Sequence, residues 1–149
     1  MLGSVIATFG LLAASAGQEG RSWQLVNLDP AHKVVLFVDR NSITGTLPVR
    51  RADLFFVDGS GDRVAGMVAT YEFDCDAARH RGMHITVFSR EQVALGSETG
   101  PTAWKPSPAD TGWDRISNFV CEAVTLYPDQ HYETELPLRQ GLSLLDGKS

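Results

Sequence analysis

Two cysteines, Cys75 and Cys121, constrain the fold of this chain more than any other feature of its sequence. They follow an apolar leader over residues 1–16, and two cysteines in an exported chain are expected to pair in an oxidising compartment. Their bridge would close a loop of roughly 45 residues, which the chain-entropy model values at ~4 kcal/mol. Because a small domain is only marginally stable, we expect the bridge to hold the fold together.

The leader has the composition of a signal peptide. It contains no charged side chain, its apolar run from Val5 to Ala14 has the length of an h-region, and Ala14-Ser15-Ala16 fits the small-x-small cleavage pattern. We expect cleavage before Gly17, which leaves a periplasmic or secreted mature protein. Display at the cell surface is the alternative. The run is too short to span a bilayer, so no membrane span is predicted; a short buried helix is the other interpretation.

Alternating and β-branched segments predict an antiparallel sheet in the first two thirds of the chain. Turns rich in Asp, Gly, Ser and Asn separate these segments, and strands joined by short turns pair antiparallel. The predicted strands are residues 22–28, 33–39, 47–57, 64–74 and 82–95, the last of which a bend can divide into a fifth and a sixth strand. Cys75 follows the fourth strand on the apolar side, in register with Tyr71 and Phe73.

A change of period predicts one amphipathic helix over residues 111–125, which Asp110 or Thr111 can cap. Its apolar residues recur at spacings of three and four: Trp113, Ile116, Val120 and Val124. Cys121 lies at the margin of this stripe, where it can reach a neighbouring sheet. We therefore predict an α+β fold, with an antiparallel sheet of five to six strands and one C-terminal helix packed on one face and held by a Cys75–Cys121 disulfide.

The predicted organisation is a signal peptide (residues 1–16), one domain (17–126) and a C-terminal tail (127–149). The chain is long enough for one domain with a real core, and two would be crowded. In the tail we expect a short strand over His131–Leu138 and a loose polar end.

Six short motifs follow one another in a characteristic order: an early Trp, a strand ending in Val-Asp, an Asn-Ser-Ile turn, a strand ending in Asp-Cys, a Trp-x-Pro and a helix ending in Val-Cys. In this chain they are Trp23, Phe37-Val38-Asp39, Asn41-Ser42-Ile43, Phe73-Asp74-Cys75, Trp104-Lys105-Pro106 and Phe119-Val120-Cys121. This order, over about residues 22–122, resembles the surface-adhesin protein E-like domain of bacterial envelope proteins. The resemblance implies a sheet with a disulfide-held helix and an adhesin-like role, but it carries over only the two cysteines.

The charge pattern argues against nucleic-acid binding. The net charge is −5 at pH 7, and the one basic cluster, Arg79-His80-Arg81 with Arg90 further on, is interpreted as a solvated strand or turn. We predict a partner from the envelope or the extracellular matrix, either a protein or peptidoglycan-associated material, and the sequence leaves the oligomeric state open.

The candidate metal and catalytic residues do not form a recognisable site. His80 and His84 have the i, i+4 spacing of a helical zinc motif, but on a strand they would share one face about 13 Å apart, too far for one ion. Asp74 and Asp76 are expected to cap a turn. We therefore predict no metal and no cofactor. A small secreted hydrolase or metal-dependent enzyme that gathers His80, His84 and Asp76 remains the alternative.

Two further patterns have simple structural interpretations. Gly59-Ser60-Gly61 is expected to be a hairpin loop, because it lacks the helix and the Lys-Ser/Thr pair of a phosphate loop. Glu72 and Glu91 could pair as acid and base, but solvated sheet residues are the default. We predict a non-enzymatic binding module that uses an exposed strand edge or a bare sheet face, with a structural accessory of an envelope complex as a further alternative.

Overall fold

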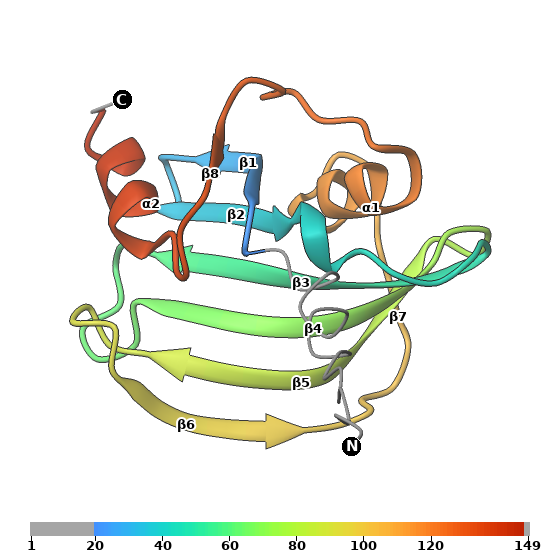
Figure 1. Ribbon diagram of the computed structural model, residues 1–149, viewed down its shortest axis with the longest axis horizontal. Helices are drawn as coiled ribbons and strands as arrows, with labels where there is room; N and C mark the ends of the chain where they lie inside the picture. Colours follow the sequence, from blue (N-terminus) through green and yellow to red (C-terminus); the bar gives the residue numbers. More distant parts are fainter. Residues whose placement is uncertain (1–19, 148–149) are drawn as a thin grey trace, which may run out of the picture.

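The computed structural model describes residues 20–147, which form one antiparallel sheet of eight strands with two α-helices (Figure 1). The predicted signal peptide and its cleavage site lie outside the described residues. The strands are β1 (Trp23–Asp29), β2 (Val34–Asp39), β3 (Val49–Asp58), β4 (Gly66–Asp74), β5 (Arg79–Phe88), β6 (Ala94–Thr99), β7 (Lys105–Pro106) and β8 (His131–Tyr132). The helices are α1 (Gly112–Glu122) and α2 (Leu138–Leu145), and a 3-10 turn (Arg40–Ser42) follows β2.

The sheet follows the order β6-β5-β4-β3-β2-β1-β8, and β7 pairs with the start of β5. From β1 to β6 each strand lies beside its neighbour in sequence, because the connecting turns are short. The predicted α+β class, with an antiparallel sheet and a C-terminal helix on one face, is confirmed. The sheet has eight strands where five to six were predicted, because the two-residue strand β7 was not predicted and the short strand of the tail joins the same sheet as β8.

Helix α1 begins and ends close to the predicted positions. Its first turn is capped by Thr111, whose hydroxyl accepts a hydrogen bond from the Asp114 N–H. The helix ends at Glu122, three residues before the predicted end, because Ala123 adopts the left-handed conformation with φ of 58°.

The disulfide between Cys75 and Cys121 confirms the predicted bridge and joins the end of β4 to the last turn of α1. Arg50 on β3 adds a second contact at this end of the helix, since its guanidinium donates to the Val120 carbonyl at 3.2 Å. The core on this face of the sheet consists of Val26, Leu36, Val38, Ala52, Leu54, Phe73, Ile116, Phe119 and Val120.

Helix α2 covers the opposite face of the sheet. Its Leu138 is 1% exposed and belongs to a second core with Trp23, Leu25, Val35, Phe37, Phe55, Val57 and Ala65. Gly141 permits this close packing, because a Cβ there would lie 2.7 Å from the Cγ2 of Val57. The predicted strand over His131–Leu138 is therefore wrong beyond Tyr132, and the segment expected to be loose contains a helix that packs on the core.

Candidate interaction surface

The two helices cover the sheet unevenly. Among the described residues, α1 packs mainly on β1 to β4 and α2 packs on β1, β2 and β3. Figure 1 shows β4, β5 and β6 extending below both helices as an open sheet. We call β1, β2, β3 and β8 with the helices the inner half of the molecule, and β4, β5 and β6 the outer half. In the outer half, helix α1 covers only the part of one face around Phe73 and His80, and the rest of the surface is available to a partner.

One face of the outer half, together with the adjoining strand β3, carries three arginines, a glutamate and a tryptophan in contact with one another. The carboxylate of Glu72 on β4 accepts from Arg51 at 3.1 Å and pairs with Arg81 at 2.8 Å. The guanidinium of Arg81 also lies 4.5 Å from the ring centroid of Trp104, and that of Arg79 lies 4.7 Å from the same ring. These five residues define the arginine–tryptophan surface. Arginine and tryptophan are the residues most often found at binding hot spots.

The arginines keep the neighbouring carboxylates ionised at neutral pH. The hydrogen bond from Arg81, together with that from Arg51, lowers the pKa of Glu72 below its ordinary value of 4.5. Asp74 lies beside the surface, and its pKa is lowered by the hydrogen bond from the Ala77 N–H and by Arg79, whose Nε is 3.1 Å from its carboxylate. Each arginine keeps part of its side chain in solvent, with 49% exposed for Arg51, 45% for Arg79 and 31% for Arg81.

Hydroxyl groups continue the same face toward the free edge of the sheet. Thr86 on β5 and Ser97 on β6 lie 2.9 Å apart through their hydroxyl oxygens, and the His84 ring lies 3.2 Å from the hydroxyl of Thr99. Further in, Thr70 donates to Asp53 at 2.6 Å. This part of the face is polar and hydrogen-bonded across the strands.

The other face of the outer half contains an apolar groove. Met67, Ile85 and Val87 line it together with Gly96, Ser97 and Glu98 of β6, and its volume is about 430 Å³. These three apolar side chains share a face with the α1 core, because Met67 pairs with Phe56 and Val87 pairs with Met67. The groove is therefore the continuation of the α1 core beyond the reach of the helix.

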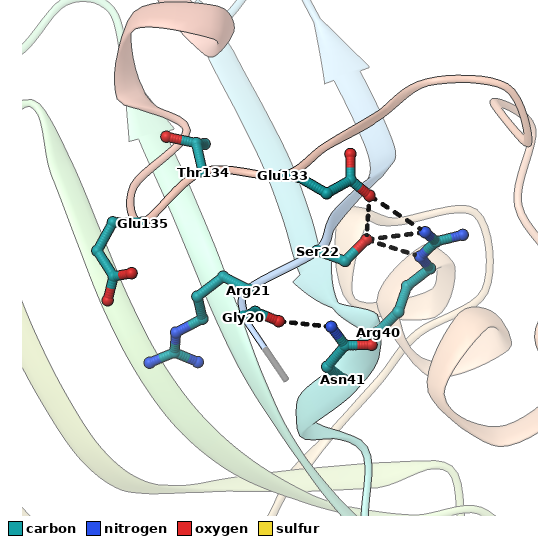
Figure 2. Close-up of a pocket in the computed structure, with 8 residues that line it drawn as sticks. All are labelled: Gly20, Arg21, Ser22, Arg40, Asn41, Glu133, Thr134 and Glu135. Carbon is teal, nitrogen blue, oxygen red and sulfur yellow. Dashed lines mark hydrogen bonds and ion pairs between the residues drawn. The ribbon is translucent and has the colours of Figure 1, made fainter. Parts of the chain in front are cut away.

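A second cavity, of about 410 Å³, lies where the chain enters β1 (Figure 2). The guanidinium of Arg40 donates to the Ser22 hydroxyl, which donates in turn to Glu133 at 2.8 Å. The bond from Ser22 lowers the pKa of Glu133. Arg21 bridges the carboxylates of Asp39 and Asp53. These charged groups are already paired with one another, so the cavity is best explained as a polar junction between β1, the 3-10 turn and the segment before α2.

The structure separates the two candidate histidines. His80 pairs with Phe73 and is 3% exposed on the α1 face, whereas His84 pairs with Thr70 on the opposite, open face. The expectation that they share a face is wrong, because a bulge between Gly82 and His84 reverses the side-chain alternation. In the described part of the chain no group of three His, Cys, Asp or Glu residues is placed to hold a metal ion.

His80 packs against helix α1 and serves the structure of the domain. Its ring stacks on Trp113 of α1 with centroids 3.6 Å apart, and its Nδ1 lies 2.7 Å from the Ser107 hydroxyl. Burial, with a smaller contribution from Lys105, lowers the pKa of His80 below its ordinary value of 6.5. The neutral ring is therefore the form that the fold favours.

The acidic residues considered as candidate site residues also have structural roles. Asp74 caps the turn after β4 as expected, accepting from the Ala77 N–H at 3.0 Å. Glu72 lies on β4, where it pairs with arginines of the two neighbouring strands. Glu91 lies in the turn between β5 and β6, so the two carboxylates are not brought together. Residues 59–61 form the predicted hairpin loop, in which both the N–H and the hydroxyl of Ser60 donate to Asp58.

Trp104 is the residue of this surface that sequence reasoning did not single out as a contact for Arg79 and Arg81. It is positioned by β7, where His80 pairs with Lys105, and this pairing joins segments more than twenty residues apart in the chain. No local sequence pattern indicates such a contact.

None of the described helices is long and apolar enough to cross a membrane.

Comparison with known proteins gives one match. The sequence model of the family described as surface-adhesin protein E matches residues 15–122. Strand β8 and helix α2 follow the matched residues. No curated protein and no solved structure matches the chain.

Proposed function

The chain belongs to the surface-adhesin protein E family, and on that premise we propose that it is an exported, disulfide-stabilised and non-enzymatic binding module of the bacterial envelope. Family membership suggests an adhesin-like role at the surface or outside the cell. The Cys75–Cys121 disulfide supports the same placement, since such bonds persist in oxidising compartments.

The observation that carries the proposal is the uneven cover of the sheet. A fold that needed its sheet only for stability would gain by covering it, yet β4, β5 and β6 extend beyond both helices. The open face of these strands and of the adjoining β3 presents Arg51 and Arg81 with Trp104 beside them, which combine charge, planar hydrogen-bond donors and a large apolar ring. Such residues contribute more to a protein interface than to the stability of an exposed surface.

Binding assays with the oxidised chain starting at Gly17 test this function. The chain is immobilised and exposed to isolated envelope fractions and to a panel of extracellular-matrix proteins. The variants Arg81→Ala and Trp104→Ala are expected to weaken the binding of the selected partner by about tenfold or more. Arg63→Ala is the matched control, because it removes an exposed arginine from the β3–β4 loop, outside the arginine–tryptophan surface.

The controls decide how the result is interpreted. A partner that binds the Arg81 and Trp104 variants as tightly as the parent chain would remove the arginine–tryptophan surface from the proposal. Thermal unfolding of each variant shows that a loss of binding does not come from a loss of fold. Delivery through a secretory pathway, followed by intact-mass measurement, tests export: the expected product begins at Gly17 and carries no free thiol before reduction.

The positions of the candidate residues do not support the enzymatic alternative. It required His80 and His84 to act together, and the structure places them on opposite faces of β5. Family membership also suggests a non-enzymatic role. We therefore advance no catalytic function.

A further inference from the structure

Strand β6 is an open edge of the sheet. In the strand order of the described residues it stands at one end, with β5 on its inner side. The Gly100 N–H donates to the Met83 carbonyl at 2.7 Å, which sets the alternation of the ladder between β5 and β6. From that alternation, Gly96 and Glu98 direct their backbone groups toward β5, and Ser97 and Thr99 direct theirs outward.

The opposite edge of the sheet is closed. Strand β8 has two residues, and beside it the segment before β8 satisfies the outer side of β1. The Leu25 N–H donates to the Gln130 carbonyl at 3.0 Å, and the Thr125 hydroxyl donates to the Leu25 carbonyl at 2.9 Å. Proteins usually protect long edges with proline, lysine or a covering segment. Strand β6, Ala94–Thr99, contains neither proline nor lysine.

The two faces beside this edge differ in polarity. The apolar groove of Met67, Ile85 and Val87 reaches β6 on one face, and the hydroxyls of Thr86 and Ser97 lie on the other. Because the side chains of a strand alternate between faces, a segment added to β6 would place every second side chain beside the groove and the others beside the hydroxyls. The edge therefore selects an alternating apolar and polar sequence.

Charge adds a further element of selection. Glu98 lies at the rim of the groove, and among the described residues no lysine, arginine or histidine forms an ion pair with it. The chain as a whole carries a net charge of −5. A basic side chain next to the apolar ones would complement this rim.

We propose that β6 accepts an extended segment of a partner protein as an additional strand, with alternate apolar side chains in the groove and a lysine or arginine opposite Glu98. Backbone hydrogen bonds to Ser97 and Thr99 supply affinity, and the groove and Glu98 supply selectivity. The proposal rests on the binding function proposed above and names the chemistry of the partner.

A synthetic peptide provides the probe. It is a blocked peptide of alternating valine and threonine with one lysine, added to the oxidised, isotope-labelled chain and followed by NMR. We expect slower hydrogen exchange at the Ser97 and Thr99 amides, and shift changes at Ile85, Val87 and Glu98. A peptide of the same sequence with N-methyl groups on alternate residues is expected to bind about tenfold more weakly or not at all.

Two variants of β6 separate edge pairing from general stickiness. Ser97→Pro removes an outward N–H, a change that an edge strand tolerates, and is expected to weaken peptide binding by about tenfold. Ser97→Ala keeps that N–H and removes only the hydroxyl, so its loss of affinity is expected to be clearly smaller. Gly96→Val is expected to reduce binding by filling the groove while leaving the fold intact, because a Cβ at Gly96 has no atom within 4 Å.

Any one of four outcomes would overturn the proposal. The peptide binds Ser97→Pro as tightly as the parent chain, or its contacts map to the arginine–tryptophan surface, or Ser97 and Thr99 are protected without peptide in a concentration-dependent dimer, which makes a second copy the occupant. A natural partner that loses affinity for Trp104→Ala but not for Ser97→Pro would refute strand addition and keep the binding function. If the peptide adds to β6 but no envelope or matrix partner binds the chain, strand addition is kept and the proposed binding function is refuted.

Discussion

The inner and outer halves of the molecule use the same sheet in different ways. In the inner half, β1, β2 and β3 lie between α1 and α2, and Trp23, Phe37 and Phe55 are completely buried. In the outer half, most residues of β6 are exposed, and the side chains between strands are held by ion pairs and hydroxyl contacts. Exposed ion pairs contribute little stability. The difference indicates that the inner half supplies most of the folding energy and that the outer half, apart from Phe73 and its neighbours under α1, is free to serve recognition.

Removing the disulfide is expected to have the largest effect on this division, because it links β4 of the outer half to α1 of the inner half. The double variant Cys75→Ser/Cys121→Ser should lose about 4 kcal/mol of unfolding free energy, since its unfolded chain is no longer constrained by the loop. Urea unfolding of the oxidised protein, with and without reductant, measures the loss. A reduced protein as stable as the oxidised one would show that packing alone holds α1 on the sheet.

Shortening one apolar side chain in each half tests the contrast in packing. Leu138→Ala in α2 should cost about 3 kcal/mol, because it leaves a cavity in the core of Trp23 and Phe37. Val87→Ala in the groove should cost no more than about 1 kcal/mol, because solvent already reaches that site. Denaturant midpoints and slopes give both values. Equal losses would mean that the outer half is as important to folding as the inner half.

Local signals explain which parts of this division could be predicted from the sequence. Helix α1 was predicted because Thr111 caps it and its apolar stripe is regular, and β1 to β4 were predicted from alternation bounded by turn residues. Helix α2 was missed because it is short, has no side-chain cap at its start and contains Gly141, which is unfavourable in the interior of a helix taken alone. Its formation depends on contact with Val57, which is distant in sequence.

The features of the candidate surface depend on pairing between segments that are distant in the chain, so they were harder to predict from the sequence. The bulge before His84 changes the face on which that residue lies, and Gly82 is the only nearby residue that hints at it. The contact of Trp104 with Arg81 depends on β7 pairing with β5. The bare edge and the groove follow from where the helices end on the sheet, which is a property of the assembled fold.

Acidification should have the smallest of these effects and tests the non-covalent contact between the halves, where His80 of β5 stacks on Trp113 of α1. Because burial lowers the pKa of His80 in the folded state, the unfolded chain takes up this proton first as the pH falls. The stabilising contribution is complete above the ordinary value of 6.5 and is lost as the pH drops from there through the folded-state pKa. Unfolding free energy measured between about pH 7.5 and 5 should therefore decrease toward acid.

Two histidine variants assign this decrease to the junction. His80→Phe keeps a ring against Trp113 but cannot titrate, so its unfolding free energy should change less between those pH values, even though it loses the bond to Ser107. His84→Gln removes an exposed histidine of the open face and should retain the decrease of the parent chain. The groups that face His80 are Lys105, Tyr71 and Ser107. Burial raises the pKa of Tyr71 further from this interval, and the carboxylates whose pKa values are lowered become protonated only at lower pH. If His80→Phe loses stability toward acid as steeply as the parent chain, the junction between α1 and β5 does not sense the proton, and the acid sensitivity must come from other groups of the protein.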